Sequence, residues 1–186
     1  MKAKEYKDLC GKTLSRKNPE DDQDHMLMGI FTELGEILDI YKKNICRDVP
    51  KPVDLVHLKE EIGDVAFYSY NLCSMLGVDL EIEEGLPTVK SDKDVRDSLL
   101  ATIGCYGLVY SGHIPLSRFP ALVLSTCGKI AEYYGFTLED SYKANIDKLH
   151  KVRYKDGYSD GAHDSRDLEK EYKTLNSEKT TEQGEV

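Results

Sequence analysis

Two pairs of acidic residues are the strongest chemical feature of this sequence. Glu33 and Glu36 form a Glu-x-x-Glu pair, and Glu61 and Asp64 form a Glu-x-x-Asp pair further along the chain. Residues three apart on a helix share a face, so each pair would present its two carboxylates together. If the two helices are neighbours, all four carboxylates can converge on one point. Such a group needs a cation, and Mg²⁺, with Mn²⁺ as the alternative, prefers oxygen ligands and leaves positions for substrate phosphates.

A solvated acidic surface is the alternative interpretation, because most Glu-x-x-Glu pairs on helices simply face water. Apolar residues adjoin both pairs, Leu34 and Ile37 in the first and Ile62 and Val65 in the second, which favours a position beside the core. A di-iron centre is disfavoured because the sequence contains no Glu-x-x-His motif. It also contains no phosphate-binding Gly-x-x-x-x-Gly-Lys-Ser/Thr loop.

A dense group of basic residues is the second chemical feature. Asn145 and Lys148 share a helix face by their spacing, and Lys151, Arg153 and Lys155 follow closely. Arginine and lysine side chains in such a group could hold a polyphosphate opposite a metal ion. The competing interpretation is an exposed basic helix end that complements the helix dipole.

The overall charge limits the classes of partner. The chain has 186 residues, with 34 Asp and Glu against 25 Lys and Arg, for a net charge of -9. This excess disfavours nucleic-acid polymers and anionic membranes as partners. No apolar run reaches the length of a membrane span, and the first residues lack a signal peptide's apolar stretch. Five cysteines without a Cys-x-x-Cys pair favour reduced packing cysteines and a cytoplasmic protein, in the host cytoplasm if the source is viral.

Helical periodicity runs through almost the whole chain, and no convincing strand pattern interrupts it. The predicted helices cover residues 4–14, 25–43, 53–76, 92–111, 116–135 and 138–152. The polar stretch through Asp24 is expected to cap the second helix, and Gly77 to end the third. Acidic Glu139 and Asp140 suit the start of the last helix. The predicted fold class is therefore all-α, a helical bundle with a four-helix core.

An internal repeat is one explanation for that core. The hairpin predicted over 92–135 resembles the hairpin over 28–76, but the four positions aligned with the acidic pairs are uncharged. In this alignment the acidic residues Glu33, Glu36, Glu61 and Asp64 fall on Cys105, Leu108, Phe119 and Leu122, respectively. A degenerate duplication would give one chain with a single competent site. Coincidence between two amphipathic hairpins is the other explanation.

Together these motifs resemble the MazG-like all-α nucleoside triphosphate pyrophosphohydrolases, a superfamily that also holds the dimeric dUTPases and phosphoribosyl-ATP pyrophosphohydrolase. The family signature is Glu-x-x-Glu, Glu-x-x-Asp and an Asn/Lys element, matched here by Glu33, Glu36, Glu61, Asp64, Asn145 and Lys148. The resemblance extends over most of residues 4–166. One departure is that the degenerate hairpin separates the second and third motifs, as in the duplicated arrangement of the dimeric dUTPases.

The resemblance implies an enzyme, a hydrolase that converts a nucleoside triphosphate, expected to be a dNTP, to the monophosphate and pyrophosphate. A metal-activated water would attack the α-phosphorus. Glu33, Glu36, Glu61 and Asp64 would hold Mg²⁺, and Glu33 or Glu36 would act as the catalytic base. The predicted substrate-binding residues are Lys43, Asn145, Lys148, Arg153 and Tyr158.

The resemblance leaves the base preference open, since Phe31, Tyr68, Tyr154 and Tyr158 would stack on any base. We expect a pyrophosphohydrolase domain over 1–160, a polar and partly disordered extension over 161–186, and a homodimer or higher homo-oligomer. The alternative function is a non-catalytic helical binding or assembly protein whose acids are a solvated face. The sequence assigns no role to any of the five histidines.

Overall fold

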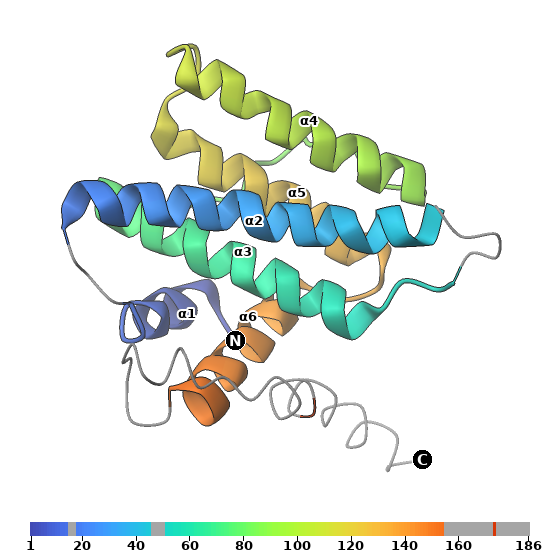
Figure 1. Cartoon of the computed structure of the whole chain (residues 1–186), viewed down its shortest axis with the longest axis horizontal. Helices are drawn as coiled ribbons and strands as arrows, with labels where there is room; N and C mark the ends of the chain where they lie inside the picture. The colour runs from blue at the N-terminus through green and yellow to red at the C-terminus, as the bar shows by residue number, and fades with distance from the viewer. Residues whose placement is uncertain (15–17, 46–50, 155–172, 174–186) are drawn as a thin grey trace.

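The structure, a computed structural model, describes residues 1–14, 18–45, 51–154 and 173 (Figure 1). Over this part of the chain it is all-helical and contains no strand, which confirms the predicted class. The helices are α1 (Ala3–Cys10), α2 (Pro19–Ile45), α3 (Leu55–Leu76), α4 (Asp92–Tyr110), α5 (Phe119–Tyr133) and α6 (Leu138–Asp147). None of them combines the length and the hydrophobicity needed to cross a bilayer. Apart from Lys173, the predicted extension over 161–186 lies outside the described residues.

The two longest helices, α2 and α3, form an antiparallel hairpin along the front of the molecule (Figure 1). α2 begins at Pro19, earlier than predicted, so the polar residues through Asp24 form its first turns rather than a cap. The side chain of Asn18 accepts a hydrogen bond from the backbone of Asp21 at 2.9 Å and caps this end. Asp54 caps α3 in the same way, and Gly77 ends α3 as predicted, with a positive φ of 70°.

A second hairpin, α4 and α5, completes a four-helix core. α4 packs against α2 and α5 packs against α3, so each helix of the second hairpin lies beside the corresponding helix of the first. The predicted helix over 116–135 is divided, because a 3₁₀ turn (Leu116–Arg118) precedes α5. Phe119, the residue aligned with Glu61, is fully buried and packs 5.6 Å from the ring of Phe31. Of the other aligned residues, Cys105 and Leu122 are half-buried and Leu108 is exposed, so only Phe119 replaces an acid by core packing. Duplication remains an interpretation from sequence.

On the opposite side of α3 lie α1 and α6, which cross the hairpin (Figure 1). The ring of Tyr6 in α1 stacks on Tyr142 of α6 at 4.4 Å. Gly63 permits the close approach of α6, since a Cβ there would lie 2.8 Å from the carbonyl oxygen of Ser141. α6 continues as a π-helical segment, η2 (Lys148–Arg153), where the sequence predicted one regular helix. This crossing brings the C-terminal motif to the acidic hairpin.

Candidate metal centre

The two acidic pairs converge at the seam between α2 and α3. Glu33, Glu61 and Asp64 each offer a carboxylate oxygen, and these three atoms lie within 4.8 Å of one another. The cause is the helical period: Leu34 and Ile62 are fully buried in the core, which turns their acidic neighbours toward the facing helix. Glu61 has only 6% of its surface exposed, so this acid is not part of a solvated face.

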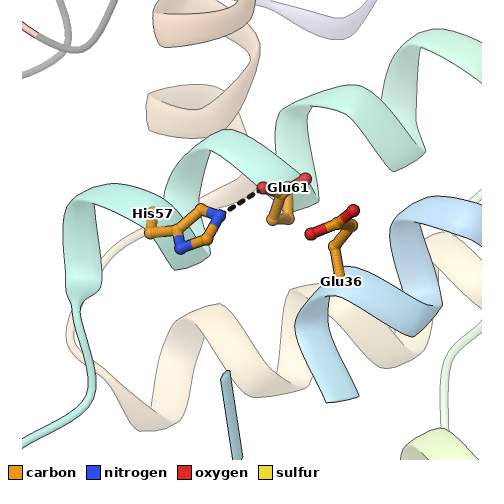
Figure 2. Close-up of side chains that lie close together, drawn as sticks. All are labelled: Glu36, His57 and Glu61. Atoms are coloured by element: carbon orange, nitrogen blue, oxygen red, sulfur yellow. Dashed lines mark ion pairs between the residues drawn. The ribbon is translucent and has the colours of Figure 1, made fainter. Parts of the chain in front are cut away.

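Glu36 reaches the same seam one helical turn further along, in company with a histidine. Glu36, His57 and Glu61 form a second group of ligand atoms that lie within 4.8 Å of one another (Figure 2). His57 Nε2 lies 2.6 Å from Glu61 Oε1. From sequence, no role was predicted for His57, although its position four residues before Glu61 places both on one helix face.

The third motif meets the second at Asp64. The side-chain amide of Asn145 donates to Asp64 Oδ1 at 2.5 Å. The ammonium of Lys148 donates to Asp64 Oδ2 at 2.5 Å and to Glu60 Oε1 at 3.2 Å. Both side chains are buried, Asn145 at 1% and Lys148 at 0% exposure. Substrate binding by Asn145 and Lys148 stays a prediction. Their contacts indicate a further role, which is to hold Asp64 in position.

α1 contacts both Asn145 and the backbone of α3 through Tyr6. The hydroxyl of Tyr6, itself fully buried, donates toward Asn145 Oδ1 at 2.8 Å and toward the carbonyl oxygen of Gly63 at 3.0 Å. With its oxygen engaged by Tyr6, the amide of Asn145 presents its nitrogen to Asp64. The orientation of one acidic ligand therefore depends on three helices.

The cluster carries more negative than positive charge. Its carboxylates are Glu33, Glu36, Glu60, Glu61 and Asp64, and its cations are Lys148 and, when protonated, His57. Burial, the negative charge of Asp64 and a hydrogen bond shared with Glu61 raise the pKa of Glu33 to about 8. Burial likewise raises the pKa of Glu60, and the charge of Lys148 opposes this. A metal-free protein therefore keeps a proton within the cluster near neutral pH.

Glu61 behaves differently from its neighbours because it has hydrogen-bond donors. Burial acts to raise its pKa, but the hydrogen bonds from His57 and Glu33 outweigh burial and lower it. The same contact with Glu61 raises the pKa of His57. A divalent cation of this kind binds carboxylate oxygens and is attracted by excess negative charge. The cluster has both, so these residues fit Mg²⁺ or Mn²⁺.

The remaining predicted substrate contacts are only partly described. Lys43 of α2 forms an ion pair with Asp39 at 2.5 Å. It also lines a pocket of about 220 Å³ that adjoins the cluster through His57. The side chain of Arg153 and the whole of Tyr158 lie outside the described residues.

Three aromatic residues that were expected to stack on a base have protein partners or little exposure. Tyr154 is buried, and Phe31 and Tyr68 are half-buried. The ring of Phe31 packs edge-on against Tyr106 of α4 at 4.8 Å, inside the contact between the two hairpins. The structure thus brings together the acidic pairs, Asn145 and Lys148, but among the residues it describes it assigns no aromatic residue to a base-binding surface.

Comparison with known proteins adds no assignment: no family model, curated protein or solved structure matches the chain. The functional interpretation therefore depends on the residues and contacts described above.

Proposed function

We propose that this protein is a MazG-like pyrophosphohydrolase, which hydrolyses a nucleoside triphosphate, expected to be a dNTP, to the monophosphate and pyrophosphate with Mg²⁺ or Mn²⁺. One observation carries the proposal. Glu33, Glu61 and Asp64, from two helices, converge within 4.8 Å, and Lys148, from a distant motif, contacts Asp64 at the same point. A solvated acidic face does not need a buried acid such as Glu61 or a buried lysine from a distant part of the sequence.

The residues of the cluster would act as metal ligands, as a catalytic base or as positioning residues. Glu33, Glu36, Glu61 and Asp64 would hold the metal ion. When bound, Mg²⁺ supplies charge neutralisation at phosphate oxygens and lowers the pKa of water. Glu33 or Glu36 accepts the proton of the attacking water. Asn145 and Lys148 keep Asp64 in place, as their contacts indicate.

The polyphosphate chain of the substrate would lie toward basic side chains. Lys43, beside the pocket that adjoins His57, has the position for this among the described residues. Arg153 and Tyr158 keep this role as a prediction from sequence. The reaction needs no covalent bond to the protein. The water oxygen bonds to the α-phosphorus, and the bond from the α-phosphorus to the oxygen that bridges it to the β-phosphorus breaks. Pyrophosphate leaves with that electron pair.

Hydrolysis in ¹⁸O-labelled water tests the reaction and its regiochemistry together. Purified protein is incubated with each dNTP, dUTP and each NTP in the presence of Mg²⁺. The products are separated, and their masses are measured by mass spectrometry. Attack at the α-phosphorus places the label in the monophosphate. Label in pyrophosphate, or the absence of products from every substrate, would reject the proposal.

Paired variants test the residues. The double variant Glu61→Ala/Asp64→Ala should lose turnover, whereas Glu81→Ala/Glu84→Ala, two exposed acids outside the cluster, should keep it. Full activity in the first variant would show that the metal assignment is wrong. A protein that binds neither Mg²⁺ nor nucleotide, with no shift in melting temperature, would instead be the non-catalytic assembly protein.

We also propose that the protein acts in the cytoplasm as a homodimer or higher homo-oligomer. Support for self-association comes from large apolar side chains exposed along α4, namely Leu100, Leu108 and Tyr110. Such a surface is unusual for a monomer when the residues are contiguous. Sedimentation equilibrium of the wild type and of Leu100→Lys/Leu108→Lys checks this, since only the wild type should exceed the monomer mass.

A further inference from the structure

Among the described residues, His57 is the one nitrogen ligand in a site otherwise made of oxygens, and the proposed Mg²⁺ chemistry has no use for it. Its Nε2 faces Glu61, and the carboxylate of Glu36 approaches from α2 across the seam (Figure 2). One ligand atom from each of the three residues lies within 4.8 Å of the other two. The group therefore has the composition of a mixed nitrogen and oxygen metal site.

Glu61 belongs to both ligand groups, and this links them. It contributes an oxygen to the group with Glu33 and Asp64 and to the group with Glu36 and His57. A carboxylate has two oxygens and can bridge two cations, as carboxylates do in two-metal sites. The two groups thus describe adjacent positions with different donors, the first with oxygen only and the second with an imidazole.

His57 is held on rigid backbone, near the start of α3. Its backbone N–H donates to the capping side chain of Asp54 at 3.3 Å, so the imidazole starts from a capped helix end rather than a loop. The side chain is 38% exposed and lines the pocket next to Lys43, and Glu36 is also exposed. Solvent therefore reaches this position, which leaves coordination sites for water or phosphate oxygen.

The donor set determines the metal. Imidazole nitrogen is a good ligand for first-row transition metal ions, whereas Mg²⁺ takes oxygen ligands. A metal ion needs the unprotonated imidazole, so it would take the place of the proton that joins His57 to Glu61. We propose that Glu36, His57 and Glu61 form a second cation position, which binds a first-row transition metal ion more tightly than Mg²⁺. This inference rests on the proposed metal centre, and it concerns the selectivity of one position within it.

Direct metal binding tests the inference without any assay of activity. The full chain is stripped of metal, and Co²⁺ and Mg²⁺ are titrated separately by calorimetry, with the visible absorption of Co²⁺ as a second readout. Co²⁺ should bind at least about tenfold more tightly than Mg²⁺ at one position. His57→Gln should weaken Co²⁺ by at least about tenfold more than it weakens Mg²⁺, because Mg²⁺ loses only the partner of its ligand Glu61. The matched control is His113→Gln, an exposed histidine bonded to Ser111 outside the cluster, which should bind both ions as the wild type does.

A second variant covers the case in which His57→Gln perturbs folding. Glu36→Gln keeps the contact between His57 and Glu61 and should also weaken Co²⁺ by about tenfold. The ¹⁵N signals of the His57 imidazole should broaden at one equivalent of Co²⁺. If His57→Gln folds and binds Co²⁺ like the wild type, or if Mg²⁺ binds the wild type as tightly as Co²⁺, the inference is wrong.

The inference and the proposed function fail in different ways. Pyrophosphate release with Mg²⁺ but no preference for Co²⁺ would remove the inference and leave the function standing. Selective Co²⁺ binding that depends on His57, with no hydrolysis of any nucleotide, would retain the mixed-ligand site and remove the function.

Discussion

The ammonium of Lys148 lies 2.5 Å from Asp64 Oδ2 although 84 positions separate the two residues. Lys148 has no exposed side-chain surface, and Asp64 keeps 20% of its own. This ion pair and the hydrogen bond from Asn145 to Asp64 join the third sequence motif to the second. Because a buried charge is stable only with its partner, the pair should determine both stability and the geometry of the cluster.

Removal of Lys148 should therefore destabilise the protein strongly. Lys148→Met leaves Asp64 and Glu60 as carboxylates in a partly buried site without their cation. We expect a loss of about 3–5 kcal/mol in the free energy of unfolding of the metal-free protein, measured with urea. Lys93→Met, which removes an exposed ion pair with Asp97, is the matched control and should change stability very little. Equal effects of the two variants would contradict the structural role of Lys148.

Gly63 should be intolerant of even a methyl group. A Cβ at this position would lie 2.8 Å from the carbonyl oxygen of Ser141 and 2.9 Å from Cβ of Asn145, both on α6. Since that backbone cannot give way without moving α6, Gly63→Ala should cost about 1–3 kcal/mol by thermal or urea unfolding. Gly35→Ala is the control, because a Cβ at Gly35 meets nothing within 4 Å. That variant should be neutral or more stable by up to about 1 kcal/mol, because alanine is the better helix former.

The metal-free protein should lose stability as the pH rises from about 5 to about 8. Burial, Asp64 and Glu61 raise the pKa of Glu33 from 4.5 to about 8, so the folded state binds this proton more tightly than the unfolded chain. The stability that Glu33 contributes is complete below its unfolded pKa and disappears as the pH passes through the folded one. The raised pKa of His57, caused by Glu61, acts in the same direction above pH 6.5.

Urea titrations in EDTA at several pH values measure this slope, whose limit is about 1.4 kcal/mol per pH unit for each proton. Glu33→Gln, an uncharged mimic of the protonated acid, should have a shallower slope, with the part due to His57 remaining. Saturating Mg²⁺ should also flatten the wild-type slope, because the cation replaces the proton. A slope that is identical in wild type and Glu33→Gln would show that Glu33 does not hold the proton.

The convergence of the acids could be predicted from sequence because it depends on local rules. Helical spacing places Glu33 with Glu36 and Glu61 with Asp64, and a short connection makes the two helices neighbours. The start of α2 was missed because apolar periodicity begins only after the first turns, although Pro19 followed by acids is a helix-start pattern.

The burial of Lys148 and the role of His57 could not be predicted in the same way. Lysines are almost never fully buried, and from sequence Lys148 was predicted only to bind substrate. Its burial depends on how closely α6 approaches α3 at Gly63, a tertiary feature that no local pattern records. The spacing of His57 and Glu61 was visible, but nothing in the sequence shows that Glu36 faces them from α2.

Tyr6 should matter to the site despite its distance in sequence. Its hydroxyl contacts Asn145 Oδ1 and the carbonyl oxygen of Gly63, and Tyr6→Phe would leave both acceptors buried without this donor. We expect a loss of about 1–3 kcal/mol in the free energy of unfolding. Mg²⁺ affinity should also fall, because Asn145 no longer has a fixed orientation toward Asp64. Tyr110→Phe, at a residue that is 85% exposed, is the matched control and should change neither quantity. If Tyr6→Phe lowers stability but leaves Mg²⁺ affinity intact, α1 supports the fold and not the metal centre.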